Sequence, residues 1–359
     1  MDKIIKRVLE TLEENGFEAF IVGGYVRDCL LGISSFDVDI CTNALPKDIY
    51  NLFNISPNKY GGSNIKIKKY NIDITTYRKE TKYINRHPNE VEYISDLTTD
   101  LLRRDFTINA ICMDKEDKVI DKLNGIEDLN NCLIKSIGNA NKKMKEDPLR
   151  ILRAIRFATI LNFDIDDELK MAIKNNVELV NTLSKDRLKG EISKILMSKN
   201  FLKGLKLFDE LGISKHINLE YNDVVYCNDI MGMYAQINID LLFTKEQKDF
   251  IIKIKEIIDN DKIEAIELYK YGLYICTVAG QILNYKKEDI MNMYNSLPIH
   301  DKKDIAITGL EIANVLGINP SKIIGKILTD IEEQIVNKNI NNDIDSIKKY
   351  LLVNKERWL

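Results

Sequence analysis

Two aspartates one residue apart are the residues of this chain best suited to metal chemistry. In the stretch "FDVDI", Asp37 and Asp39 flank Val38, and the run has the character of a β-strand. Strand alternation places both carboxylates on one face, while Phe36, Val38 and Ile40 face the core. Two carboxylates this close repel each other unless a cation lies between them. The pair therefore favours a divalent-cation site, although a D-x-D pair alone is also typical of a solvated edge strand.

A glycine turn just before this strand indicates what the cation would accompany. "AFIV" has the character of a buried strand, Gly23 and Gly24 of a turn, and "YVRDCLLG" of a helix. This order places free backbone N–H groups at a helix start, where a phosphate can bind with no Cβ in the way. Arg27, in the first turn, adds a planar set of donors for phosphate oxygens. The segment favours a nucleotide-phosphate site over an ordinary tight turn.

A third carboxylate would complete the metal site. Asp73 in "NIDITT" lies on the same side as the pair if its strand is adjacent, and simple exposure is the alternative. The six cysteines and three histidines form no close pair with metal-ligand spacing. Metal chemistry must therefore depend on carboxylates, which favours hard ions such as Mg²⁺. The cysteines are expected to be reduced core residues.

A second group of functional residues follows in "EDPLRILRAIRFA". Asp147, Arg150, Arg153 and Arg156 are spaced by threes and form a stripe along a helix. Asp147 can only accept hydrogen bonds, whereas Arg150 can only donate them. Cytosine and adenine each present an amino donor beside a ring acceptor and match this pair; guanine and uracil present the reverse pattern. The stripe predicts selection of C and A by protein groups without an RNA template, and a basic surface face is the alternative.

Two further motifs have plausible structural explanations. In "RRDFTINA", an Arg–Asp pair that caps a short helix would account for Arg104 and Asp105. In "RLKGEISKIL", Arg187 and Glu191 have i, i+4 spacing, and we expect them to form an ion pair that braces the arginine-rich helix.

The elements that position these residues fall into two regions. The first 140 or so residues mix strand and helix signals, whereas from about Asn141 apolar residues recur at three- and four-residue spacing. This pattern predicts an α/β head followed by a long helical region. The segment from about Glu220 to Gln236 has weak periodicity and no assigned structure. A further unit is expected to begin near Pro298.

The motifs together resemble those of a known family. "GGYVRD", "DVDI", "LLRRDFTINAI", "EDPLRILRAIRFA" and "RLKGEISKIL" follow one another between Gly23 and Leu196. In this order they resemble the successive motifs of the class II tRNA nucleotidyltransferases, the family of the CCA-adding enzymes and bacterial poly(A) polymerases. The stretch "ITGLEIANVLGINPSKIIGKIL" is similar, more loosely, to the C-terminal part of CCA-adding enzymes, with Ser321 in place of a usual glycine. Between about 201 and 300 the resemblance is thin.

The resemblance implies an α+β fold with four parts. These are a polymerase-β-like catalytic head (1–140), an all-helical neck that recognises the base (141–200), a helical body (201–297) and a helical tail that binds tRNA (298–359). It also implies template-independent addition of C and A to the tRNA 3′ end from CTP and ATP, with Mg²⁺ as cofactor and pyrophosphate as product. Asp37 and Asp39 would be the catalytic metal ligands. The nucleotide would be bound by Gly23, Gly24, Arg27, Arg104, Asp105, Asp147, Arg150, Arg153 and Arg156. Within this set, Asp105 would accept a hydrogen bond from the ribose 2′-OH.

One departure from the family keeps other activities open. The loop "RKETKYINRHP" matches the family at Arg78, Glu80 and Tyr83, but Asn85 replaces an aspartate and one residue is missing before Arg86. In the family this loop is associated with the switch to the final A, so a CC-only or A-only enzyme is an alternative. Poly(A) polymerase is a less favoured alternative, because the basic extension usual in that enzyme is absent. A tRNA-binding protein without catalytic activity is a further alternative, but the paired aspartates argue against it because such a protein would not need them.

The bulk composition sets the expected surroundings. No apolar run approaches the roughly 18 residues that span a bilayer, and the first residues have the spacing of an amphipathic helix. We expect a cytoplasmic protein without a membrane or a stable protein partner. Its partners would be CTP, ATP and the 3′ end and acceptor/T arm of tRNA. The net charge of -3 does not contradict this, because phosphate binding depends on local clusters of charge.

Overall fold

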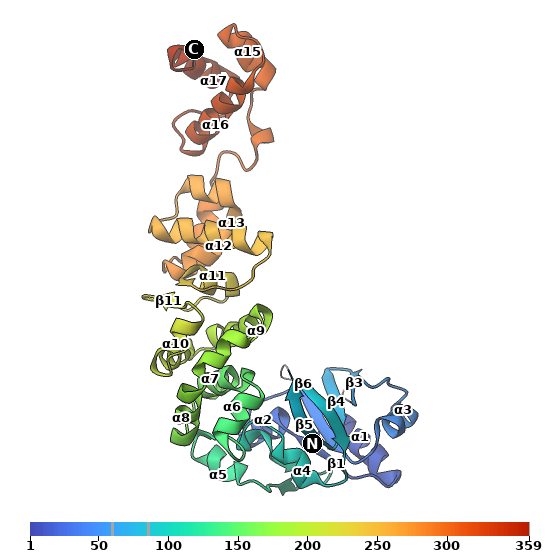
Figure 1. Ribbon diagram of the computed structural model, residues 1–359. Helices are drawn as coiled ribbons and strands as arrows, with labels where there is room; N and C mark the ends of the chain where they lie inside the picture. The colour runs from blue at the N-terminus through green and yellow to red at the C-terminus, as the bar shows by residue number, and fades with distance from the viewer. Residues whose placement is uncertain (59–60, 85–86, 359) are drawn as a thin grey trace. The chain divides into compact units, whose positions relative to one another are not determined.

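The chain forms two compact units. The computed structural model describes residues 1–58, 61–84 and 87–358, with side chains described outside 80–91. The first unit comprises residues 1–219 and 239–241, and the second comprises 220–238 and 242–359 (Figure 1). The expected four-part division at 140, 200 and 297 is finer than this split and stays a prediction.

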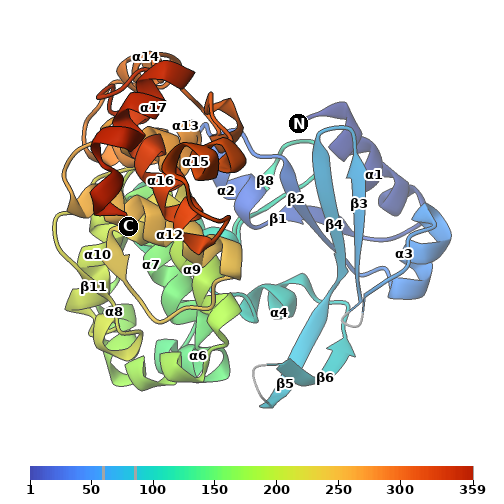
Figure 2. The same ribbon diagram turned by 90° about the horizontal axis from the view of Figure 1, so that it is seen from above.

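A six-stranded mixed sheet is the centre of the head. Its order is β3-β4-β2-β1-β7-β8, in which β2 and β4 are parallel and the other neighbours are antiparallel (Figure 2). The strands are β1 (Ala19–Val22), β2 (Asp37–Thr42), β3 (Gly62–Ile67), β4 (Tyr70–Thr76), β7 (Cys112–Met113) and β8 (Val119–Ile120). The strand signals at "EAFIV", "FDVDI", "NIKI", "NIDITT" and "AICM" are thus confirmed.

The two faces of β2 differ as alternation requires. Val38 and Ile40 are buried, while Asp37 and Asp39 lie on the opposite, accessible face. Phe36 was expected to face the core, and this was wrong: its side chain is 48% exposed. It precedes the first residue of β2, and its ring packs beside Tyr70, with 6.1 Å between the ring centroids.

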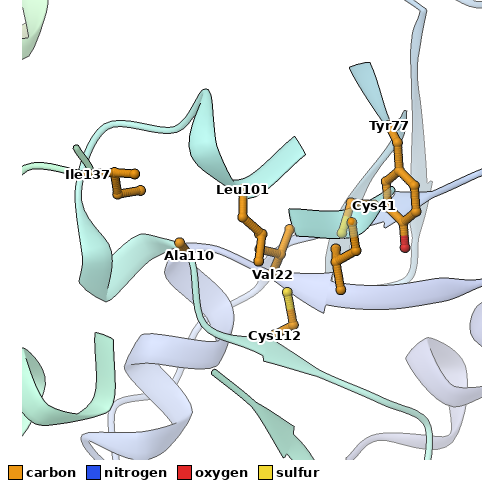
Figure 3. Close-up of a cluster of buried hydrophobic side chains, with 8 residues drawn as sticks. Val22, Cys41, Tyr77, Leu101, Ala110, Cys112 and Ile137 are labelled. Carbon is orange, nitrogen blue, oxygen red and sulfur yellow. The ribbon is translucent and has the colours of Figure 1, made fainter. Parts of the chain in front are cut away.

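A helix covers the far end of the aspartate face. Leu101 of α4 (Leu97–Leu102) packs in a buried cluster with Val22, Cys41 and Cys112 (Figure 3). Cys41 follows Asp37 and Asp39 on the same face of β2. One face of this sheet is therefore apolar under α4 and acidic toward the start of β2.

The other head helices are short. Those preceding α4 are α1 (Lys3–Glu14), α2 (Gly24–Leu30) and α3 (Pro46–Phe53), and α3 has Pro46 in its first turn as expected. The apolar positions Ile5, Leu9 and Leu12 of α1 are buried. In α2 the N-cap is Gly23 with φ of 83°, a conformation that favours glycine.

The loop "RKETKYINRHP" contains parts of two strands. β5 (Arg78–Ile84) pairs antiparallel with β6 (His87–Tyr93) outside the main sheet. β6 was expected, whereas β5 was missed. The family departures at Asn85 and Arg86 lie outside the described residues.

Helices build the rest of the first unit. They are α5 (Gly125–Asn130), α6 (Ala140–Glu146), α7 (Leu149–Leu161), α8 (Asp167–Asn175), α9 (Lys185–Leu196) and α10 (Phe201–Glu210). The α7 side chains Ile151, Leu152 and Ile155 are fully buried, and α7 contacts both α9 and α10. A two-residue parallel pair, β9 (Leu133–Ile134) with β10 (Asp164–Ile165), also lies here. The helical region thus retains a little sheet.

The second unit is mainly helical. Its helices are α11 (Ile230–Ala235), α12 (Lys245–Asp259), α13 (Ala265–Ile282), α14 (Lys287–Asn295), α15 (Gly309–Leu316), α16 (Lys322–Val336) and α17 (Ile344–Val353). The previously unassigned segment contains α11 and β11 (Glu220–Tyr221), and β11 pairs with β12 (Ile237–Asn238). The predicted all-helical body therefore includes a small antiparallel ladder. Among the described residues, no helix has the length and apolar character needed to cross a bilayer.

The cysteines are free thiols in both units. Cys41, Cys112, Cys227 and Cys276 are buried, as expected of core residues. Cys29 and Cys132 are exposed, which corrects the expectation that all six are core residues.

Candidate active site

A single cleft contains every residue predicted for catalysis and nucleotide binding. It has a volume of about 510 Å³ and lies within the first unit, between the sheet and the arginine-rich helix α7. The predicted residues that line it are Gly23, Gly24, Arg27, Asp37, Asp39, Arg104, Asp105, Asp147, Arg150, Arg153 and Arg156. Residues 120 positions apart in the sequence therefore face one space.

The glycine turn and the aspartate pair are in close contact. Val22, the last residue of β1, pairs with Asp39, so the turn at Gly23 lies directly beside this carboxylate. A Cβ on Gly23 would lie 3.0 Å from Asp39 Oδ2. A side chain at this position would therefore press on the carboxylate and fill part of the cleft.

The electrostatics of Asp39 fit a cation site. Although Asp39 keeps solvent access, the surrounding protein partly desolvates it and raises its pKa above the usual value. Arg104 opposes this shift, while the Asp73 and Asp37 carboxylates raise the pKa of Asp39 further. A divalent cation would relieve this repulsion, and carboxylate oxygens are ligands that hard cations prefer.

Asp73 lies on the strand next to the aspartate pair. It is on β4, directly opposite Asp39 in the parallel register, and thus on the same face of the sheet. Its Oδ1 accepts a hydrogen bond from Asn64 Nδ2 at 2.8 Å. Within the described parts of the chain, no group of three or more Asp, Glu, His or Cys side chains is arranged to hold a metal. The strands that carry Asp39 and Asp73 are adjacent, as expected, and metal ligation by Asp73 stays a prediction.

Arg27 is held from two sides. Its Nε and Nη2 donate to Asp28 Oδ1 at 2.9 and 2.7 Å, and its Nη1 donates to Asn109 Oδ1 at 2.7 Å. Its guanidinium lies over the Phe157 ring, 5.1 Å from the centroid. The side chain is 7% exposed, so its position in the cleft wall is well defined.

Asp105 binds an arginine of α7 rather than its neighbour Arg104. Arg153 donates to Asp105 Oδ2 from Nε at 2.7 Å, while Asp105 Oδ1 accepts from the Asn109 amide and from the backbone N–H of Phe106. Burial alone would raise the pKa of Asp105, but Arg153 and these hydrogen bonds outweigh it and lower the pKa to about 2. The capping alternative was wrong: the N-cap of the 3₁₀ turn Thr107–Asn109 is Phe106, which makes no side-chain cap hydrogen bond, and Asp105 pairs with a distant arginine instead.

Arg104 pairs with Asp100, an acid that also accepts from Arg103. The Arg104 Nη2 lies 3.2 Å from Asp100 Oδ2, and Asp100 is fully buried. The Arg104 Nε is buried and has no hydrogen-bond partner in the described parts of the protein. One donor of Arg104 is therefore uncommitted beside the cleft.

Asp147 and Arg150 occupy the junction between α6 and α7. Asp147 is the extended C-cap of α6, and its Oδ1 accepts from the backbone N–H of Leu149 at 3.1 Å. Arg150 donates to Glu146 Oε2 at 3.2 Å and to the carbonyl oxygen of Arg103 at 3.1 Å. The backbone break at Asp147 and these bonds place both side chains in the cleft wall.

The expected partner of Glu191 was wrong. In the described residues, Glu191 binds Arg156 Nη1 at 2.9 Å, both side chains being 9% exposed, and Arg187 is exposed. Arg156 is 35 residues away, so helical spacing could not indicate it. The bracing role predicted for Glu191 on α7 fits this contact.

Three cleft residues that contact the predicted arginines were not among the residues expected to bind the nucleotide: Asp28, Asn109 and Phe157. Asn109 bridges Arg27 and Asp105, and the ring of Phe157 lies under Arg27, Arg153 and Arg156. Asn109 and Phe157 both lie inside motifs named in the sequence analysis, and this position within a motif was the signal that could have found them.

The cleft as a whole pairs each predicted arginine with an acid. The pairs are Arg27–Asp28, Arg104–Asp100, Arg150–Glu146, Arg153–Asp105 and Arg156–Glu191. The stripe on α7 is thus largely a buried ionic network, which contradicts the alternative of a solvated basic face.

A glycine turn and paired aspartates on a mixed sheet, next to a helix that lines the same cleft, define a nucleotidyltransferase with a polymerase-β-like head. Residues 19–135 match the family model described as the poly A polymerase head domain, and residues 235–351 match one described as tRNA nucleotidyltransferase domain 2. The chain belongs to the tRNA nucleotidyltransferase family that includes the CCA-adding enzymes.

Full-length relatives support this membership. The chain is 32% identical to the CCA-adding enzyme of Ligilactobacillus salivarius, covering 98% of this chain and 95% of the relative. It is 31% identical to that of Lactococcus lactis, covering 94% of each chain. In fold it is similar to the Bacillus stearothermophilus CCA-adding enzyme in complex with CTP, with a TM-score of 0.80 at 24% identity and 99% coverage of both chains. The Thermotoga maritima CCA-adding enzyme complexed with tRNA gives a TM-score of 0.65 at 22% identity, covering 99% of this chain and 96% of that one.

Proposed function

We propose that this protein adds C and A nucleotides to the 3′ end of tRNA, using CTP and ATP and releasing pyrophosphate. The observation that carries the proposal is that Asp37 and Asp39 line the same cleft as Asp147 and Arg150. The groups proposed for nucleotidyl transfer and the groups proposed to recognise the base edge thus line one cleft. The names of the full-length relatives agree with this activity.

Each group in the cleft has a proposed task. Enzymes of this class need a divalent cation, for which we propose Mg²⁺ held by Asp37 and Asp39, with Asp73 behind them. When bound, the cation makes the terminal 3′-OH more acidic and stabilises charge on the pyrophosphate leaving group. Gly23 and Gly24 leave room for the triphosphate, and Arg27 donates to its oxygens.

Base selection follows from the fixed polarity of Asp147 and Arg150. The amino group of cytosine or adenine donates to Asp147, whose Oδ2 has no role in the contact to Leu149, and the adjacent ring nitrogen accepts from Arg150. Guanine and uracil place a carbonyl against the carboxylate and an N–H against the guanidinium. Each such buried mismatch costs about 1–3 kcal/mol. Arg104, Arg153 and Arg156 would bind phosphate or sugar, and Asp105 the ribose 2′-OH.

The remaining parts of the chain would bind the RNA. We propose that residues 141–200 act as the neck, 201–297 as the body and 298–359 as the tail, with the body and tail on the acceptor/T arm. Binding would depend on phosphates and shape. A cytoplasmic location follows from this proposal, because the proposed substrates tRNA, CTP and ATP occur together there.

A labelled-nucleotide assay tests the proposal. Purified protein and Mg²⁺ are incubated with each labelled nucleoside triphosphate and with tRNA transcripts that end before CCA, after CC or after CCA. We expect CMP on the first transcript, AMP on the second, and no GMP or UMP on any. CMP addition without AMP addition would indicate a CC-only enzyme, AMP addition alone an A-only enzyme, and long A tracts a poly(A) polymerase.

The aspartate pair is tested in the same assay. Asp37→Asn removes one metal-binding charge at constant shape, so incorporation should fall below detection while tRNA binding persists. Asp117→Asn, at an exposed position of the first unit outside the cleft, is the matched control and should behave as wild type. An active Asp37→Asn protein would refute the site assignment. Chelation by EDTA should stop the reaction, and Mg²⁺ should restore it.

A further inference from the structure

A second cleft adjoins the nucleotide cleft. Its volume is about 430 Å³, and it lies between α4, α6 and the start of β5 in the first unit. Arg103 lines both clefts. The proposed activity leaves this second space without a role.

The charge of the second cleft is strongly positive. Its lining includes Lys79, Arg103, Lys142 and Lys143, and Glu146 is the acid among its lining residues. Glu146 already accepts a hydrogen bond from Arg150, so its charge is partly compensated from the nucleotide side. The Lys142 side chain is 78% exposed, and its ammonium group is 3.9 Å from Glu146, too far for a direct hydrogen bond.

The wall between the two clefts is fixed. Lys143 Nζ donates to the backbone oxygens of Leu102 and Arg104 at 2.6 and 3.1 Å. Arg103 Nε donates to the buried Asp100 at 2.8 Å. A ligand in the second cleft would therefore be held at a defined distance from the nucleotide cleft.

The second cleft also has an apolar part. Leu102, which is 47% exposed, lines it together with Ile137, whose side chain is almost fully buried. A small free anion would gain nothing from these aliphatic groups. A nucleotide of single-stranded RNA has a charged phosphate for the lysines and a flat base for the apolar surface.

We propose that this cleft binds the 3′-terminal strand of the RNA primer, through phosphodiester groups at Lys79 and Lys142 and a base or ribose at Leu102. This inference rests on the proposed function and extends it to the second substrate. Lysine is suited to such contacts because its flexible ammonium group follows a backbone without requiring one geometry. Released pyrophosphate is the other source of the same phosphate chemistry.

Binding and kinetics of lysine variants test the proposal. Lys142→Ala, Lys79→Ala and the double variant are compared with Lys145→Ala, which lies on the same helix with an exposed side chain and does not line either cleft. Fluorescence anisotropy with a labelled tRNA transcript lacking CCA gives the Kd for RNA, independent of catalysis. Steady-state assays give the KM for tRNA, the KM for CTP and inhibition by pyrophosphate. Thermal melting confirms that each variant is folded.

We expect the double variant to weaken RNA binding about tenfold, with each single variant in between. The slope of log Kd against log salt should flatten by roughly 0.7 for each lost contact to a single strand. The KM for CTP and the kcat at saturating tRNA should be unchanged, and Lys145→Ala should match wild type.

Two results would overturn the proposal. One is a double variant whose RNA affinity equals that of Lys145→Ala; the other is unchanged RNA affinity with weakened pyrophosphate inhibition, which assigns the cleft to the product. If wild-type protein binds RNA but incorporates no nucleotide, the proposed function fails, while the anisotropy data still decide the role of the cleft.

Discussion

Phe157 organises the cationic side of the nucleotide cleft at the scale of single residues. Its ring centroid lies 5.1 Å from the guanidinium carbon of Arg27, 5.4 Å from that of Arg153 and 4.4 Å from that of Arg156. It packs edge-on against Phe106, which is fully buried. An aromatic face attracts cations through its quadrupole by about 0.5–1 kcal/mol or more. The ring therefore holds three like-charged groups close together.

Replacing this ring should weaken nucleotide binding selectively. Phe157→Leu keeps an apolar side chain but removes the aromatic face, so we expect the KM for CTP and ATP to rise about tenfold with the KM for tRNA unchanged. Steady-state kinetics measure both constants. Phe157→Tyr retains the ring and should stay near wild type. Equal losses in the two variants would contradict a role for the aromatic face.

At the scale of elements, one glycine sets the packing of α7, α9 and α10. Gly204 on α10 faces Ile195 of α9 and Thr159 of α7, and an added methyl group would overlap both side chains. The absence of a side chain therefore lets three helices approach one another behind the arginine stripe of α7.

An alanine at this position should loosen that packing. We expect Gly204→Ala to lower the free energy of unfolding by about 1–3 kcal/mol, as overpacked cores do. Gly190→Ala is the control, because Gly190 lies inside α9 with no atom within 4 Å of an added Cβ. It should be neutral or stabilise the protein by up to about 1 kcal/mol through higher helix propensity. Urea denaturation measures both, and a stable Gly204→Ala protein would show that the helices can shift apart.

Much of the element pattern could be predicted from the sequence because alternation and helical spacing are local properties. The buried strand around Ile40 and the aspartates on its other face follow from period two alone. β5 was missed because "RKETKYI" is mostly polar and pairs only with β6, away from the main sheet. Phe36 was misplaced because alternation does not say where a strand begins.

The residues that line the site were predicted better than the ion pairs that they form. Residue types at fixed spacing indicated Asp147 and the three arginines that follow it. The acid that meets each arginine depends on how distant segments pack, as with Arg153 and Asp105, 48 residues apart. Local spacing suggested Arg187 for Glu191 and Arg104 for Asp105, and tertiary structure supplied other arginines.

At the scale of the whole molecule, the contact between Asp105 and Arg153 makes stability depend on acid. Asp105 follows the head helix α4, and Arg153 is on α7, so this contact between a buried carboxylate and a half-buried arginine ties the sheet to the helical region. The pKa of Asp105 is lowered to about 2 in the folded protein, below the usual value of 3.8. The unfolded chain therefore takes up this proton first as pH falls. The stabilisation by the charged carboxylate is complete above about pH 4 and is lost between about pH 4 and pH 2.

Asp105→Asn should reveal this contribution. At pH 7 the variant should be less stable by roughly 2 kcal/mol, because Arg153 loses its buried counter-charge. As pH falls from 5 to 3, the stability difference between wild type and variant should shrink. Denaturation curves at several pH values measure it. A difference that stays constant down to pH 3 would contradict the link between this ionisation and stability.

The pairing of every cleft arginine with an acid has a consequence for turnover. If these arginines bind the triphosphate as proposed, it competes with carboxylates that already pair with the guanidiniums, so a free phosphate ion gains little free energy by entering. Under the same proposal, the carboxylates pair with the arginines again as pyrophosphate leaves. Each guanidinium would then regain a carboxylate partner and would not be left as an unpaired buried charge. A highly charged product could therefore depart without a large electrostatic penalty.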